Sequence, residues 1–316
     1  MPAEPTSVDE GRRELDVRVG LGMFASEAQL EQLLAISRPV ELEAGHVLHA
    51  GDSPPTAIFQ VMSGEIALRA PDMPTWEVAA GGTVGFLDFM RGRRHSRTAV
   101  ATTAASVLEL DTTRYRDYLE DNFEVGYRIM SQLSGAIISG VISSPEAGGL
   151  LSSVAVPHTG SFAKVELPMV ERLMILSRMP AFAGATTQAL ANLAQSMTET
   201  RFEPGELVAA AGSSSSVVSL LVEGEVALEL PSGLRVLRAG RDFVAHLEEL
   251  TLTPRLSAVT ASSALIVLQI EREELLDLLE EHFDLVMTIL GSIAGEQEKL
   301  NDVEAAHATG VGTDWK

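Results

Sequence analysis

Residues 91–97 place five basic side chains within seven positions of an acidic chain. They are Arg91, Arg93, Arg94, His95 and Arg97. A glycine pair at 81–82 and a short apolar stretch, GFLDFM at 85–90, come just before them. Arginine's forked donors pair well with phosphate oxygens, and the free N–H groups at the start of a helix receive anions. The segment therefore has the residue types of a phosphate-binding site, and the alternative is a solvated surface loop.

The composition excludes several other functions. The formal net charge is −21 at pH 7, so most of the surface repels nucleic-acid phosphates and we expect no nucleic-acid partner. The chain has no cysteine, and its seven histidines show no metal-ligand spacing, so we expect no metal site. Neither a nucleophile–base pair nor a P-loop occurs, which predicts a protein that is not an enzyme.

The chain shows no membrane or secretion signal. No apolar run approaches the roughly 20 residues that a membrane helix needs, and the first 20 residues lack the apolar core of a secretory signal. We therefore expect no membrane association and a cytoplasmic location.

The elements that must position the basic segment occur twice in the chain. Residues 42–68 read like residues 202–228, and the match continues along both copies at a constant offset of 160 residues. The matched positions include Gly45 with Gly205, Gly64 with Gly224, Leu87 with Leu247, Asp111 with Glu271, and Phe123 with Phe283. A period this long indicates a tandem domain duplication and not a solenoid of short repeats.

Each copy follows the same order of elements. Helical patterns at 26–38 and 186–197 begin at the expected N-caps Ser26 and Thr186. Short runs with alternating apolar residues follow, with glycine turns between them. The predicted strands are 46–50, 57–62, 65–70, 98–102 and 106–110, then 206–211, 219–224, 225–230, 257–261 and 265–270. We predict an α+β fold of two tandem jelly-roll-like β-barrels, each flanked by N- and C-terminal helices.

A long amphipathic helix is expected at the end of each copy. The two helices are predicted over 113–141, with a break near Asn122, and over 273–300. Their apolar residues either pack against the chain's own barrel or form the seam of a homodimer. The sequence leaves both alternatives open.

Composition shifts suggest where the domains begin and end. The segment between the copies is rich in serine, glycine and proline, as expected of a linker. The predicted parts are a flexible leader at 1–20, a first domain at 21–143, a linker at 144–168, a second domain at 169–303 and a flexible tail at 304–316.

Four segments give these patterns a family resemblance: 58–68, 178–208, 220–228 and 253–261. Each copy resembles the cyclic nucleotide-binding domain of bacterial cyclic-AMP-receptor-like regulators and of the regulatory subunits of cyclic-AMP-dependent kinases. The resemblance implies a regulatory protein with a cyclic mononucleotide or cyclic dinucleotide as ligand and a protein as partner. It also implies a phosphate-binding cassette, approximately F-G-E-L and then P-R-x-A-T. In that cassette the Glu accepts from the ribose 2′-hydroxyl and the Arg pairs with the cyclic phosphate.

The first cassette, residues 85–98, departs from this pattern. Its expected ligand-binding residues are Gly85, Phe86, Leu87, Arg94, His95, Ser96, Arg97 and Thr98. Phe86 stands at the Glu position and cannot provide the charged hydrogen bond, which contributes roughly 1.5–3 kcal/mol. His95 stands at the Arg position and is a poorer phosphate partner, because only its protonated form is charged. Arg94 or Arg97 could supply the charge if the loop is shifted.

The second cassette, residues 245–258, keeps more of the pattern. Its expected ligand-binding residues are Ala245, His246, Leu247, Pro254, Arg255, Ser257 and Ala258. Pro254 and Arg255 match the Pro-Arg pair, whereas His246 stands at the Glu position. Glu248 or Glu249 could replace the lost carboxylate if the loop slips by two or three positions.

Two hypotheses on function follow. The first is a sensor that binds a cyclic nucleotide or related phosphate ligand and signals to a partner protein. The alternative is a ligand-independent interaction or scaffold protein, which the loss of Glu from both cassettes favours. A transcription factor is disfavoured, since only about 33 residues follow Phe283, too few for a DNA-binding module. A kinase inhibitor segment is disfavoured because Glu14 and Leu15 follow the arginines at 12–13.

Overall fold

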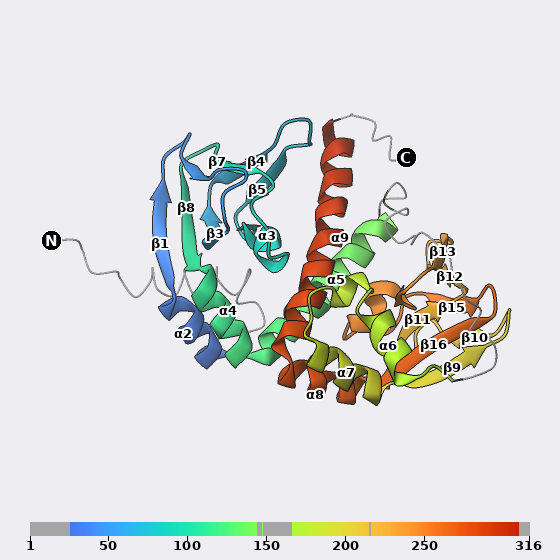
Figure 1. Ribbon diagram of the computed structural model, residues 1–316. Coiled ribbons are helices and arrows are strands. Elements are labelled where there is room, and N and C mark those ends of the chain that lie inside the picture. The colour runs from blue at the N-terminus through green and yellow to red at the C-terminus, as the bar shows by residue number, and fades with distance from the viewer. Residues whose placement is uncertain (1–25, 144–146, 148–165, 215, 310–316) are drawn as a thin grey trace. The chain divides into compact units, whose positions relative to one another are not determined.

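The structure is a computed structural model that describes residues 26–143, 147, 166–214 and 216–309. The predicted leader at 1–20 and most of the predicted linker at 144–168 lie outside the described residues. The elements of the described residues are labelled in Figure 1.

The contacts divide the chain into two compact units. The first unit comprises Met1–Ile129 together with Asn301–Lys316, and the second comprises Met130–Leu300. The sequence-based boundaries assign residues 130–143 to the first domain and 301–303 to the second, so the two divisions differ at these segments.

The first unit begins, within the described residues, with helix α2 (Glu27–Ala35). Ser26 caps it as predicted: Gln29 N donates to Ser26 Oγ at 3.3 Å, and Ser26 N donates to Gln29 Oε1 at 2.9 Å. This reciprocal pair is a capping box. The helix ends at Ala35, earlier than the predicted end at 38, because strand β1 (Ser37–Leu42) begins two residues later and pairs with β8.

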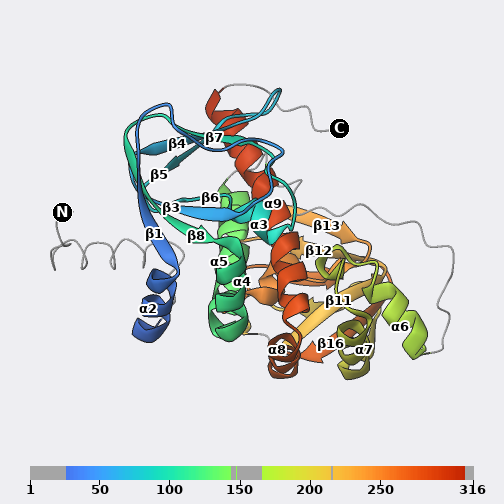
Figure 2. The same cartoon turned by 60° about the vertical axis from the view of Figure 1, so that its left-hand side comes forward.

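The strands of the first unit form two four-stranded antiparallel sheets. Their bounds are β1 (Ser37–Leu42), β2 (Val47–His49), β3 (Ala57–Ser63), β4 (Glu65–Arg69), β5 (Trp76–Ala79), β6 (Thr83–Val84), β7 (Thr98–Ala101) and β8 (Ala105–Asp111). The strand orders are β1-β8-β3-β6 and β2-β7-β4-β5, and Figure 2 shows β1, β8 and β3 side by side. The buried cluster includes Val61 and Val107 from one sheet and Ile66 and Ala99 from the other. Each sheet thus turns one apolar face to a common core.

The second unit repeats this topology. Its strands are β9 (Thr198–Phe202), β10 (Leu207–Ala209), β11 (Val217–Glu223), β12 (Glu225–Glu229), β13 (Arg235–Ala239), β14 (Asp242–Phe243), β15 (Ala258–Ala261) and β16 (Leu265–Glu271). Their orders are β14-β11-β16-β9 and β10-β15-β12-β13. Strands β11, β12, β15 and β16 begin 160 residues after β3, β4, β7 and β8. The predicted duplication and the predicted fold of two β-rolls are both confirmed.

Two glycine turns explain why the duplication is visible in the sequence. Gly64 and Gly224 have φ angles of 82° and 101°, and each joins two neighbouring strands. A Cβ at either position would collide with a backbone carbonyl oxygen, that of Ala104 or Ala264. Both the left-handed conformation and the close approach require glycine.

Six strands were not predicted, namely β1, β5, β6, β9, β13 and β14. All six are edge strands of their sheets. Edge strands are often short and carry charged residues or proline, so their apolar pattern is weak. Strand β1, with the sequence SRPVEL, buries only Leu42 fully.

The helices at the end of each unit are each interrupted once. Helices α4 (Thr112–Asp121) and α5 (Phe123–Ser143) are separated at Asn122, as predicted. Helices α8 (Arg272–Glu281) and α9 (Phe283–Thr309) are separated at His282, which the prediction of a single helix over 273–300 missed. Helix α9 also extends into the predicted tail. None of the helices in the described ranges combines the length and apolar character that a membrane span requires.

Three further elements precede the second barrel. They are α6 (Met169–Leu176), the 3-10 turn η2 (Pro180–Phe182) and α7 (Thr187–Ser196). Thr186 caps α7 as predicted, since Ala189 N donates to its Oγ1 at 3.3 Å.

The apolar residues of the expected dimer seam are buried within the chain. Leu275, Leu279, Val286, Ile289 and Ile293 are each no more than 5% exposed. Their burial favours the packing alternative, and the homodimer through 113–141 and 273–300 stays a prediction.

Candidate functional site

Each cassette consists of a short helical turn, a loop and the start of a strand. In the first cassette the turn is α3 (Phe86–Met90), and in the second it is the 3-10 turn η3 (His246–Leu250). Gly85 precedes α3 with a φ of 81°, and a Cβ on it would lie 3.0 Å from Ala57 O and 3.2 Å from His95 Cε1. Ala245, at the equivalent position, has a φ of −93°. The backbone therefore tolerates a side chain in the second cassette but not in the first.

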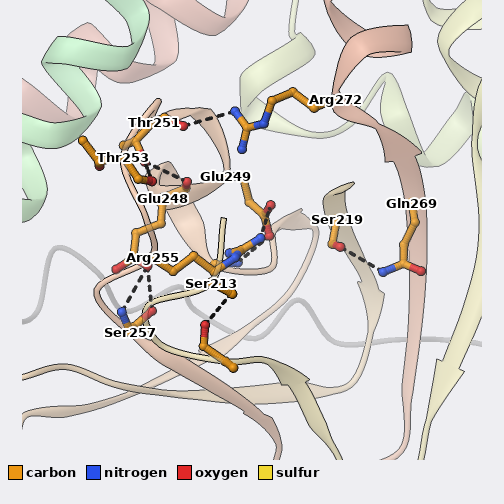
Figure 3. A network of polar contacts seen from close by, with 12 residues as sticks. Ser213, Ser219, Glu248, Glu249, Thr251, Thr253, Arg255, Ser257, Gln269 and Arg272 are labelled. Atoms are coloured by element: carbon orange, nitrogen blue, oxygen red, sulfur yellow. Dashed lines mark hydrogen bonds and ion pairs between the residues drawn. The ribbon is translucent and has the colours of Figure 1, made fainter. Parts of the chain in front are cut away.

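Arg255 is the central cation of the second cassette. Its side chain is 4% exposed, and its Nη2 lies 2.7 Å from Oε2 of Glu249, whose side chain is 1% exposed. Figure 3 shows the guanidinium and this carboxylate facing each other. The buried Nε and Nη1 of Arg255 have no hydrogen-bond partner in the described part of the chain. Only one of the guanidinium's three nitrogens thus makes a hydrogen bond there.

Two neighbouring glutamates accept the donors around Arg255. Glu249 Oε1 accepts from the backbone N of Ala245 at 3.4 Å. Glu248 Oε2 accepts from Ser257 N at 3.2 Å and from Ser257 Oγ at 3.0 Å (Figure 3). The structure thus brings together the predicted residues Ala245, Arg255 and Ser257, and it adds two carboxylates to them.

The pKa of Glu249 reflects its burial. Burial raises the pKa of Glu249 above its ordinary value, and the attraction and hydrogen bonds of Arg255 and Ala245 offset this only in part. A buried ion pair gains little net stability, since both charges lose their hydration. The buried Arg255–Glu249 pair therefore carries a desolvation cost that an exposed ion pair would not.

Other residues of the second cassette serve as supports. Leu247 is buried at 4% exposure, and Pro254 precedes Arg255 in a loop whose Leu252 is 60% exposed. The backbone N of Arg255 donates to Ser213 O at 3.0 Å, which fixes the loop against the segment before β11. Ala258 is the first residue of β15, and His246 is the first residue of η3.

A different carboxylate neutralises the first cassette. Asp88, which aligns with Glu248 in the duplication, accepts from Arg93 Nε at 2.8 Å and from Ser96 N at 3.3 Å. Its Oδ2 also lies 3.3 Å from Nδ1 of His95. Burial alone would raise the pKa of Asp88, but the hydrogen bonds from His95 and Arg93 hold it below its ordinary value. His95, the predicted substitute for the cassette arginine, is thus already paired.

A second imidazole stacks on His95. The rings of His49 and His95 lie 3.6 Å apart with an angle of 15° between their planes. Burial, followed by repulsion from His95, lowers the pKa of His49 to about 4, and the charge of Asp88 opposes this. His49 is therefore neutral near pH 7.

Phe86, at the position of the family's Glu, lies in an aromatic cluster. It is 6% exposed, and its ring centroid is 6.5 Å from that of Tyr115 in an edge-to-face arrangement. Phe89 and Tyr118 complete the cluster at 5.8 Å and 6.0 Å from Tyr115. The cluster anchors α3 to α4, and the Phe86 ring itself supplies no acceptor for a sugar hydroxyl.

The remaining arginines of the first cassette face other carboxylates. Arg97 is 2% exposed, its guanidinium carbon lies 3.6 Å from the centroid of the Trp76 ring, and its Nη2 pairs with Asp302. Trp76 Nε1 also donates to Asp302, at 3.0 Å. Arg94 is 61% exposed and pairs with Asp52 at 3.1 Å. Both arginines therefore have carboxylate partners, and their role as substitutes for the cassette arginine stays a prediction.

The rest of the first cassette has structural contacts. The hydroxyl of Thr98 accepts from Gly51 N at 2.9 Å, and Leu87 O accepts from the backbone N of Arg91. Within the described ranges, no group of three or more His, Cys, Asp or Glu residues could hold a metal ion.

The role of Glu249 was only partly foreseen. The sequence identified it as a substitute for the family's ribose acceptor, but its partner in the structure is Arg255. The signal available in the sequence is a pair of acids, 248–249, between the leucines 247 and 250, since acids are unusual at buried positions unless paired.

A family model agrees with the repeated architecture. The model described as "Cyclic nucleotide-binding domain" matches residues 39–122 and 199–282, which together make up more than half of the chain. No curated protein matches the chain.

Several solved structures are similar to the chain. The regulatory domain of Toxoplasma gondii PKA with cAMP is 15% identical over 93% of this chain and 99% of its own, with a TM-score of 0.35. The regulatory subunit of a cAMP-independent protein kinase A from Trypanosoma cruzi bound to guanosine is 14% identical over 98% and 95%, with a TM-score of 0.35. A putative cyclic nucleotide-binding protein from Geobacter metallireducens is 20% identical over 40% and 96%, with a TM-score of 0.36. At these identities and TM-scores the likenesses carry no information on ligand or partner.

Proposed function

The chain belongs to the cyclic nucleotide-binding domain family, and we propose that it is a non-catalytic regulatory protein whose second cassette binds a phosphate-containing ligand of the cyclic nucleotide class. The observation that carries this proposal is the buried guanidinium of Arg255, whose Nε and Nη1 have no partner among the described residues. Buried donors are nearly always hydrogen-bonded, so two such donors on one cation indicate an anionic partner.

The chemistry around Arg255 suits a phosphodiester. A guanidinium offers parallel donors to two phosphate oxygens, and such bidentate pairs are strong. The hydroxyl and N–H of Ser257 and the N–H of Ala245 are further donors near the same cation, each at present held by a glutamate. The ligand class comprises cyclic mononucleotides and cyclic dinucleotides, and the downstream step is signalling to a partner protein in the cytoplasm.

A second candidate function is favoured by the same carboxylates. Asp88 satisfies His95 in the first cassette, and Glu249 pairs with Arg255 in the second. Cassettes whose basic side chains already pair with carboxylates of the same cassette suit a ligand-independent interaction protein. In such a protein the surfaces of the β-rolls would bind a partner.

Thermal denaturation with ligands distinguishes the two candidates. Cyclic AMP, cyclic GMP, a cyclic dinucleotide and inorganic phosphate are each added up to millimolar concentration. A ligand at 100 times its dissociation constant adds about 2.7 kcal/mol of stability. We expect stabilisation by at least one nucleotide, unchanged in His95→Ala and absent from the double variant Arg255→Met/Glu249→Gln. The double variant removes both members of the pair and so leaves no buried charge unpaired.

Stabilisation that persists in the double variant would place the ligand elsewhere. No stabilisation of the wild-type chain by any of the four compounds would favour the ligand-independent candidate.

A further inference from the structure

The second cassette already contains an anion at the position of its arginine. The carboxylate of Glu249 accepts from Arg255 Nη2 at 2.7 Å and from the backbone N of Ala245 at 3.4 Å. One guanidinium donor and one backbone N–H at the start of a helical turn are donors that a phosphate would also use. A side chain of the cassette thus occupies part of an anion-binding arrangement (Figure 3).

We propose that Glu249 is an internal competitor of the ligand: it holds the anion position of the second cassette, and a phosphate-containing ligand binds by displacing it. This proposal rests on the proposed function, since it assigns Glu249 the control of affinity at the same site.

The geometry differs from that of a purely structural ion pair. A bidentate pair would use two parallel donors of Arg255, whereas Glu249 uses Nη2 alone, and Nε and Nη1 have no partner in the described part of the chain. Both remaining donors are buried, so a phosphodiester reaches them only as η3 moves and carries the carboxylate away. The exchange therefore couples ligand binding to a movement of η3.

The free-energy cost of burying Glu249 in the cassette also favours its displacement by a ligand. Glu248 and Glu249 are adjacent, 5% and 1% exposed, and both carboxylates point into the cassette. Each buried carboxylate loses hydration, which raises the free energy of the occupied state. The two lie on η3, a 3-10 turn, whose hydrogen bonds have poorer geometry than those of an α-helix. A ligand phosphate that takes over Arg255 would let Glu249 move toward water.

Protonation of Glu249 provides an independent way to change the affinity for the ligand. The charged groups that act on it are Arg255 and Arg272, the latter at the start of α8, whereas the carboxylate of Glu248, on the same turn, contacts Ser257. Burial raises the pKa of Glu249. Its neutral form therefore appears at higher pH than for an exposed glutamate, and this form competes less for Arg255. A phosphodiester keeps its single negative charge throughout, so acid pH should tighten binding.

The test measures the dissociation constant of cyclic AMP by titration calorimetry on the full chain. Glu249→Gln keeps the shape of the side chain and removes its charge. We expect it to bind cyclic AMP at least about tenfold more tightly than the wild type, because a charged hydrogen bond to Arg255 no longer has to be broken. Glu229→Gln, at an exposed position on β12, is the matched control for the loss of one negative charge and should bind as the wild type does.

Each outcome decides between the two proposals. Equal affinity of wild type and Glu249→Gln would overturn the role of Glu249 and leave the proposed function standing. An equal gain in Glu229→Gln would show a general charge effect and overturn the competitor role. No binding by either wild type or Glu249→Gln at millimolar cyclic AMP would overturn both proposals for this ligand class.

Wild-type protein gives a second test that does not depend on the variant's folding. Cyclic AMP affinity is measured at pH 5.5 and at pH 8. Tighter binding at pH 5.5 supports the competitor role, and equal or weaker binding contradicts it.

Discussion

The two cassettes lie at equivalent positions of two equivalent β-rolls, yet they neutralise their cations differently. In the first, His95 pairs with Asp88 and stacks on His49, and Phe86 anchors the turn in an aromatic cluster. In the second, Glu249 pairs with Arg255 through only one of the guanidinium nitrogens. The duplication has thus preserved the backbone frame while the chemistry diverged.

This difference is the basis for proposing the ligand site in the second cassette. The charges of the first cassette have short-range partners within the same unit, including the Arg97 pair with Asp302. The second cassette has an arginine with two buried donors that have no partner among the described residues. Our proposal therefore places the ligand site in the second cassette and gives the first a structural role.

The largest expected difference concerns loss of the central cation. Arg255→Ala leaves Glu249 as an uncompensated buried charge, so the free energy of unfolding of the second unit should fall by about 3–5 kcal/mol. His95→Ala leaves Asp88 with Arg93 and Ser96 as partners, so the first unit should lose less. Urea unfolding followed by hydrogen exchange assigns the loss to each unit.

The double variant Arg255→Met/Glu249→Gln is the control for this prediction. It should restore most of the stability, because no charge is left buried alone. A cost in Arg255→Ala no greater than that in His95→Ala would contradict the contrast between the cassettes.

A second difference is the response of the first unit to acid. The pKa of His49 falls from 6.5 to about 4 on folding, so the unfolded chain binds more protons between these values. The His49 contribution to the free energy of unfolding is therefore fully present above pH 6.5. It is lost as the pH falls toward 4, by up to about 3 kcal/mol. His49→Phe keeps an aromatic ring against His95 and should remove this part of the acid sensitivity. Urea unfolding at pH 7 and pH 5 measures it, and an unchanged pH dependence in the variant would refute the assignment.

A third difference is the backbone at the start of each turn. Gly85→Ala places a Cβ in a left-handed conformation near Ala57 O, which should cost about 1–2 kcal/mol. Ala245→Gly, at the equivalent position, should cost no more than about 1 kcal/mol, since no such strain is present. Equal costs in thermal unfolding would mean that the two turns do not differ as described.

The smallest expected difference lies outside the cassettes. Ser26→Ala and Thr186→Ala each remove a helix N-cap, and each should cost about 1 kcal/mol in its own unit. The two costs should agree closely, because both caps accept a backbone N–H at 3.3 Å. Clearly unequal costs would show that the divergence extends beyond the cassettes.

Local sequence signals were sufficient for the frame of the molecule. The N-caps Ser26 and Thr186, the turn glycines 64 and 224 and the break at Asn122 each depend on neighbouring residues, and each is confirmed. Edge strands such as β1 and β13 were missed, because they are short and carry charged residues or proline, which weakens the apolar pattern.

The partners of the site residues could not be read from the sequence in the same way. Arg97 pairs with a residue 205 positions away, and it stacks on Trp76, which lies on another strand, β5. Phe86 packs against Tyr115 of α4, a contact that its position in the cassette does not indicate, and its place at a ligand stays a prediction. Glu249 was identified as a candidate, but its pairing with Arg255 depends on how η3 turns.

The most direct test of the account is the Nε–H nuclear magnetic resonance signal of Arg255, assigned with Arg255→Lys and followed as cyclic AMP is added. The account predicts that this signal shifts with added nucleotide, because the unused donors of Arg255 are those that receive the phosphate, and that it shifts at lower nucleotide concentration in Glu249→Gln. An Arg255 signal that stays unchanged in both proteins at millimolar cyclic AMP would contradict it.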